Sequence, residues 1–185
     1  RDGILSEEDL IYLGNSDPVL YGGLQNTFNI GGLRIGFYFS YSLGGKIYNY
    51  SELYMAGSSM SNQYRYMLEA WHPVRNPQSN LPRAGAVDAH VPSDLMIYDA
   101  SYIRLKNLTV DYTFPAHICR KMRIKGLKVY VSGENLWTSS PMFKYCDNYD
   151  PEVINAGDSD FRTTEGDGYS YPMLRTVTLG LNLTF

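Results

Sequence analysis

The chain has 185 residues, a formal net charge of −3 and 44% hydrophobic residues, which fits one ordinary domain. Nothing in this charge suggests a nucleic-acid partner, and no apolar run approaches the roughly 20 residues of a transmembrane helix. Tyrosine is unusually frequent, with 17 residues against 7 Phe and 2 Trp. Such a composition suits membrane-interface girdles and also sugar- or protein-binding surfaces.

The beginning of the chain is polar. Residues 1–20 are rich in turn-forming residues, and their acidic side chains lack the spacing of an EF-hand calcium loop, so we expect a solvated loop. The chain starts at Arg1 without Met or a hydrophobic leader. We therefore expect a mature product or a processed piece of a longer protein.

Two strands are predicted on either side of Gly31-Gly32, a two-residue hairpin signal. Residues 21–30 and 33–44 both alternate between apolar and polar positions, the second more strongly. The second segment is close to the ~9–11 residues of a tilted membrane strand. In a soluble sheet its apolar face would be core, whereas in a barrel it would meet lipid.

Residues 46–100 differ from the rest of the chain. The stretches from Ile47 to Met60 and from Ser61 to Trp71 are compatible with short helices, and Pro73 would end the second one. The stretch that follows is proline-rich and has little periodicity. A connection this long inside a compact domain is usually functional.

The second half repeats the strand pattern. Tyr102–Phe114 and Leu127–Leu136 alternate and are predicted as strands, with a short basic connection over residues 115–125 between them. A second long connection, residues 138–171, is rich in Asp, Gly and Tyr. It leads to the last predicted strand.

That last strand, residues 176–185, alternates without a break and ends on Phe185. Bacterial outer-membrane barrels typically close on such a strand, although a soluble sandwich can end this way too. Short and long connections alternate strictly along the five predicted strands, as the short periplasmic turns and long external loops of a barrel do. Because a barrel needs at least about eight strands, we expect the first and last strands to pair with strands outside this chain.

Several segments carry a more specific signal. Residues 99–115 read DASYIRLKNLTVDYTFP in one-letter code. Further segments of this kind are Asp2–Asp9, Gly14–Pro18, Phe39–Asn49, Leu127–Trp137, Tyr149–Glu152 and Tyr171–Thr176. In this order along the chain they resemble the C-terminal part of the β-barrel in the SusC/RagA family of TonB-dependent outer-membrane transporters.

The resemblance implies an all-β fold, an antiparallel transmembrane β-barrel segment of about five strands in a barrel of roughly 22, with long external loops carrying short helices. Residues 1–185 would form the C-terminal segment of the barrel, and the plug domain and TonB box are absent from this chain. The family location is the outer membrane of a Gram-negative bacterium. Its activity is uptake of oligosaccharides or peptides, and the implied partners are a SusD-like lipoprotein, TonB through the missing N-terminal part, the remainder of the barrel and outer-membrane lipid.

No catalytic set emerges from the sequence. His72, His90 and His117 are isolated, and two loop histidines are weak evidence for a metal site. The serines have no GxSxG context, and nothing sets Glu52 and Glu69 at the separation that glycoside hydrolysis requires. We therefore expect neither an enzyme nor a cofactor or metal.

The candidates for contact with cargo or with a lid protein are aromatic and acidic residues of the two long connections. They are Tyr48, Tyr54, Tyr66, Trp71, Tyr145, Asp147 and Tyr149. The alternative for each residue is packing, because a long loop needs a small core of its own. The alternative for the whole chain is a soluble β-sandwich carbohydrate-binding module, supported by tyrosine content alone.

The barrel interpretation makes two further predictions. The first concerns Cys119, in an inner turn, and Cys146, in an outer loop: they would lie ~25 Å apart, too far for the ~7 Å Cα separation of a disulfide. The second concerns faces. Lipid-facing residues would be Leu33, Ile35, Phe37, Phe39, Tyr41, Val177, Leu179, Leu181 and Leu183, and lumen-facing residues Arg34, Tyr38, Ser40, Thr178 and Asn182.

Overall fold

The computed structural model describes residues 10–49, 62–83, 94–145, 149–152 and 171–185. The chain divides into two compact units. The first consists of Arg1–Asp17, Gly45–Asp99 and Ile154–Tyr169. The second consists of Pro18–Gly44, Ala100–Val153 and Ser170–Phe185.

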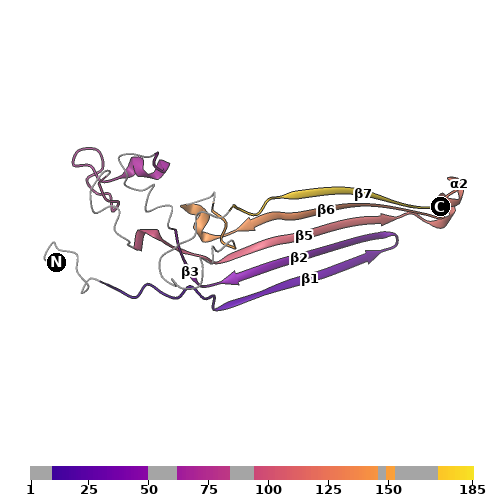
Figure 1. Cartoon of the computed structure of the whole chain (residues 1–185), viewed down its shortest axis with the longest axis horizontal. Helices are drawn as coiled ribbons and strands as arrows, with labels where there is room; N and C mark the ends of the chain where they lie inside the picture. The colour runs from indigo at the N-terminus through magenta and orange to yellow at the C-terminus, as the bar shows by residue number, and fades with distance from the viewer. Residues whose placement is uncertain (1–9, 50–61, 84–93, 146–148, 153–170) are drawn as a thin grey trace. The chain divides into compact units, whose positions relative to one another are not determined.

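The second unit is built on a five-stranded sheet in the order β1-β2-β5-β6-β7, in which every neighbouring pair is antiparallel. Figure 1 shows these strands side by side. Their bounds are Leu20–Ile30, Leu33–Leu43, Tyr102–Thr113, Gly126–Ser139 and Thr176–Thr184. All five strands predicted from alternation are therefore confirmed.

The register explains why alternation identified these strands. Thr27, Gly36, Thr109, Ser132 and Thr178 lie opposite one another across the sheet and form a row of small polar positions. The adjacent row consists of Phe28, Ile35, Val110, Val131 and Leu179. Because successive side chains point to opposite faces, one face of the sheet is apolar and the other polar.

The apolar face is uncovered along β7. Leu179 is 76% exposed, and Val177 and Leu181 are exposed as well. A contiguous apolar surface of this kind is unusual in a soluble monomer and marks contact with a partner or a membrane.

The short connection after β5 contains a helix that the sequence analysis treated as plain loop. This helix, α2, spans Ala116–Lys121 and lies near the C-terminus at the same end of the sheet (Figure 1). Cys119 is buried and free, and its thiol lies 3.7 Å from the carbonyl oxygen of Phe114. Cys146 lies outside the described residues.

The first unit contains a small two-stranded sheet, β3 (Lys46–Tyr48) paired with β4 (Ile97–Asp99). The expectation of a helix starting at Ile47 is therefore wrong at its beginning, because Ile47 and Tyr48 pair with Tyr98 and Ile97. Residues 50–61 lie outside the described part of the chain.

Two short 3-10 helices complete the described part of this unit, η2 (Arg65–Glu69) and η4 (Asp94–Met96). The expected helix between Ser61 and Trp71 is thus a 3-10 turn rather than an α-helix. Among the described residues of the first unit, the buried apolar ones are Ile47, Met67, Ala70 and Met96. No helix in the described part of the chain is long and apolar enough to cross a membrane.

Candidate functional site

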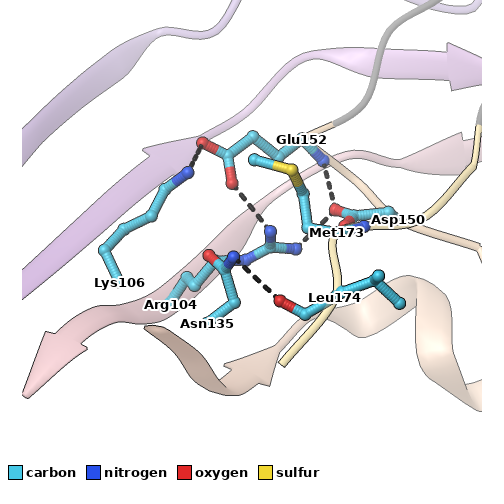
Figure 2. A network of polar contacts seen from close by, with 7 residues as sticks. All are labelled: Arg104, Lys106, Asn135, Asp150, Glu152, Met173 and Leu174. Carbon is cyan, nitrogen blue, oxygen red and sulfur yellow. Dashed lines mark hydrogen bonds and ion pairs between the residues drawn. The ribbon is translucent and has the colours of Figure 1, made fainter. Parts of the chain in front are cut away.

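Arg104 is the most deeply buried charged residue at one end of the sheet. It lies in β5, its side chain is 3% exposed, and it forms an ion pair with Asp150, which is also buried. A second guanidinium nitrogen lies 2.9 Å from Glu152 Oε2. Figure 2 shows both carboxylates converging on this one guanidinium. Buried charges are tolerated when they are paired in this way.

Glu152 continues the network to a second cation. Its Oε1 lies 2.5 Å from the Nζ of Lys106, so one carboxylate bridges Lys106 and Arg104 (Figure 2). Two cations therefore face two anions within a small volume. This charge balance allows Arg104 and Asp150 to be buried, while Lys106 and Glu152 stay partly exposed.

Asp150 ties together three parts of the chain. Its carboxylate accepts hydrogen bonds from Arg104 in β5, from the backbone N–H of Glu152 and, at 2.9 Å, from the backbone N–H of Met173. Burial by itself would raise the pKa of the Asp150 carboxyl, but the Arg104 guanidinium and the two backbone donors outweigh it and hold that pKa below 3.8. The carboxylate is therefore ionised at neutral pH, and it anchors the segment before β7 to the sheet.

A double irregularity in the sheet lies beside these side chains. The pairing of β5 with β6 shifts between Leu105 and Asn107, and Asn135 in β6 has a positive φ of 51°. Arg104 and Lys106 are two residues apart, so they lie on the same side of β5, and both reach Glu152. The bulge at Lys106 changes the alternation, so that Asn107 follows on the polar face as well. Asn135 Nδ2 donates to the carbonyl oxygen of Leu174 at 3.1 Å (Figure 2), which fastens the same incoming segment from β6.

A second charged cluster lies within the sheet itself. Arg34 in β2 is directly opposite Asp111 in β5, and its Nε lies 2.6 Å from Asp111 Oδ2. Lys128 in β6 approaches the other oxygen of Asp111 at 3.1 Å. Asp111 is only 4% exposed, whereas Arg34 is 50% exposed. This cluster belongs to the polar face, in agreement with the prediction that Arg34 lies on that face.

The candidates in the second connection come shortly before Asp150 and Glu152, the two carboxylates of the Arg104 network. Tyr145 is exposed, and the Nζ of Lys144 lies 5.3 Å from its ring centroid, which is a cation–π distance. Tyr149 directly precedes Asp150, and in the described part of the chain its buried hydroxyl has no hydrogen-bond partner. Asp147 lies outside the described residues.

The candidates in the first connection belong to the other compact unit. Tyr48 donates its hydroxyl to the sulfur of Met96 at 3.3 Å, and Tyr66 stacks on Tyr64 with ring centroids 5.8 Å apart. Trp71 donates its indole N–H to the carbonyl oxygen of Pro77 at 3.2 Å. Each residue thus has a packing role within the loop. Tyr54 lies outside the described residues.

Sequence reasoning missed the partnership of Arg104 with Asp150 and Glu152. The two segments that contain them, residues 99–115 and 149–152, were both recognised, but separately. Their opposite charges were the available signal, since the first carries Arg104 and Lys106 and the second Asp150 and Glu152. Among the described residues there is no group of three or more His, Cys, Asp or Glu arranged to hold a metal ion.

The chain is similar in sequence and in fold to one class of known proteins. No protein-family model matches the chain. It is 33% identical over its whole length to the TonB-dependent receptors P3 and P26 of Formosa agariphila, and it spans 18% and 19% of their lengths. Solved structures of the RagAB peptide importer in its closed-closed state and of the RagAB peptide transporter superpose with TM-scores of 0.70 and 0.71. The identities are 25% and 26%, the matches cover 94% and 93% of this chain, and they cover 18% of each transporter chain.

The fold and the matches together point to one class of protein. The whole chain is similar to a segment of TonB-dependent receptors, and its five-stranded sheet matches part of the RagAB transporter fold. These relatives and structural neighbours are named as receptors and importers.

Proposed function

We propose that the chain forms the C-terminal barrel segment of an outer-membrane importer driven by TonB. The observation that carries the proposal is the match of the whole chain to TonB-dependent receptors at 33% identity, together with the superposition on RagAB. The sheet supports it physically: one face is apolar and exposed along β7, and the other carries the charged and hydroxyl side chains. Such faces suit lipid on one side and a wet lumen on the other.

The cargo class is a peptide or an oligosaccharide. The two RagAB structures are of a peptide importer and a peptide transporter, which favours peptides, while the tyrosine-rich connections suit either cargo. Uptake of a fluorescent peptide mixture and of fluorescent oligosaccharides by cells, with and without the gene, distinguishes the two. Loss of uptake in cells that lack TonB supports the energy source. Uptake that is the same without the gene would refute the proposal.

The partner is a SusD-like surface lipoprotein that covers the external loops. The first connection, residues 46–100, carries a small packed segment of its own, in which Asn76 and Ser79 bond to backbone carbonyls at 3.3 and 2.6 Å. We expect deletion of residues 74–92 to weaken co-purification of the lipoprotein while the barrel still assembles. Unchanged co-purification and uptake would count against this partner.

A further inference from the structure

The polar face of the sheet holds a pocket of about 170 Å³ beside Gly36 in β2. Its lining includes Gln25 and Thr27 from β1, Arg34 and Tyr38 from β2, and Asn107 from β5. The pocket lies within the sheet, apart from the Arg104 network and from the candidate residues of the long connections.

Arg34 is held so that its terminal nitrogens remain available. Asp111 binds the Nε atom at 2.6 Å and is itself shared with Lys128. Within the described residues, neither terminal nitrogen of Arg34 has a hydrogen-bond or ion-pair partner, and half of the side chain is exposed. Two cations against one anion leave the cluster with a net positive charge beside the pocket.

A chain of hydrogen bonds sets the orientation of Asn107. The hydroxyl of Thr109 donates to Asn107 Oδ1 at 3.1 Å, and the hydroxyls of Thr109 and Ser132 also lie 3.1 Å apart. Because Thr109 has one hydroxyl proton and gives it to Asn107, Ser132 must be the donor to Thr109. The amide oxygen of Asn107 is thereby used, and its NH₂ group is left to donate.

The pocket therefore offers donors and positive charge. A guanidinium with free terminal nitrogens binds a carboxylate in a bidentate manner, and the Asn107 amide and the Tyr38 hydroxyl add neutral donors. Gly36 keeps the floor open, since a Cβ there would stand 3.5 Å from the Thr27 hydroxyl oxygen and project into this space. We propose that this pocket binds a carboxylate group, from an acidic side chain elsewhere in the same protein or from an acidic peptide cargo.

This inference rests on the proposed function in one respect, namely that the polar face of the sheet lines the interior of a barrel. The test uses the full-length protein in cells, with the photo-crosslinking residue p-benzoylphenylalanine in place of Thr27. The matched control carries the same probe in place of Phe28, the next residue of β1, which belongs to the opposite face. Cross-linked segments are then identified by mass spectrometry.

We expect the Thr27 probe to label a segment that contains Asp or Glu, and the Phe28 probe not to label it. Arg34→Gln should reduce this labelling several-fold, whereas Arg120→Gln, an exposed arginine of α2, should leave it unchanged. A labelled segment of the same polypeptide identifies an internal side chain as the ligand, and a labelled separate peptide identifies cargo. Absence of labelling, a labelled segment without a carboxylate, or full labelling in Arg34→Gln would overturn the proposal.

Two measurements keep the outcomes separate. Each variant is first checked for a folded barrel by its mobility on an SDS gel without heating, so a folding defect is not mistaken for lost binding. Fractionation of the wild-type protein tests the proposed function independently. A protein absent from the outer-membrane fraction would refute the importer, whereas a correctly located protein with no carboxylate at Thr27 would refute only the pocket.

Discussion

Two ionic clusters on one sheet are each built around an arginine of a strand, but they have different surroundings. Asp111 joins Arg34 and Lys128 between neighbouring strands, and its arginine is half exposed. The cluster around Arg104 joins the sheet to residues of the second connection, and there the arginine is 3% exposed. An arginine in an alternating strand can thus be a surface group or a buried anchor, depending on what packs over it.

The difference has an energetic consequence. Ion pairs with a solvated partner contribute about 0–1 kcal/mol, whereas removing one member of a buried pair costs about 3–5 kcal/mol. The buried cluster should therefore stabilise the placement of the loop. The exposed cluster leaves its arginine available for binding.

The largest expected effect comes from breaking the buried cluster. Arg104→Gln leaves the carboxylates of Asp150 and Glu152 without their shared cation, so we expect a loss of about 3–5 kcal/mol in the free energy of unfolding. Arg34→Gln is the matched control and should cost clearly less, because Arg34 is half exposed and the buried Asp111 keeps Lys128 as a partner. Urea unfolding of the full-length protein in lipid vesicles measures both. Equal costs would show that burial does not separate the two clusters.

The next effect tests the face on which both clusters lie. Leu181→Lys places a charge on the apolar face and should cost about 2–4 kcal/mol if that face meets the hydrocarbon core. Asn182→Lys, on the polar face one residue further, should cost far less. The same unfolding assay compares them, and a costlier Asn182→Lys would reverse the assignment of lipid and lumen.

A smaller effect is expected in the row of paired residues that contains Arg34 and Asp111. Arg34, Asp111, Tyr130 and Gly180 lie opposite one another, and a Cβ at Gly180 would overlap the Tyr130 ring. We expect Gly180→Ala to cost about 1–3 kcal/mol through overpacking. Gly126→Ala is the control, because its Cβ would meet Thr184 at an ordinary 3.6 Å. Adding Tyr130→Ala to Gly180→Ala should remove the clash, and a double variant with simply additive losses would argue against this cause.

The smallest effect concerns acid. The folded pKa of Asp150 lies below its ordinary 3.8, so its contribution to stability is complete above that value and is lost as the pH falls through the folded pKa. We expect the segment around Met173 to stay anchored at pH 5–7 and to loosen only in stronger acid. Hydrogen exchange of the Met173 amide, corrected for its intrinsic rate, reports this. Asp150→Asn should already be loose at neutral pH, and equal protection in both proteins would contradict the anchor.

The sequence by itself determined the strands and their faces. Alternation is a local property, because side chains in a strand point to opposite faces whatever lies beside them, and it located all five long strands to within a few residues. The prediction of secondary structure failed where the structure of a segment depends on residues far away in the sequence. Ile47 and Tyr48 were expected in a helix, but pairing with residues about 50 positions away made them a strand.

Only the tertiary structure decided the partners of the charged residues. The ion pair of Arg104 with Asp150 spans 46 positions, and that of Arg34 with Asp111 spans 77. The bulge at Lys106 appears in the pairing of β5 with both of its neighbours, and the only local sign of it is a break in the alternation at Lys106-Asn107. Burial likewise depends on what packs over a side chain. Arg34 and Arg104 have similar neighbours in sequence, yet Arg104 is buried against the second connection and Arg34 is half exposed.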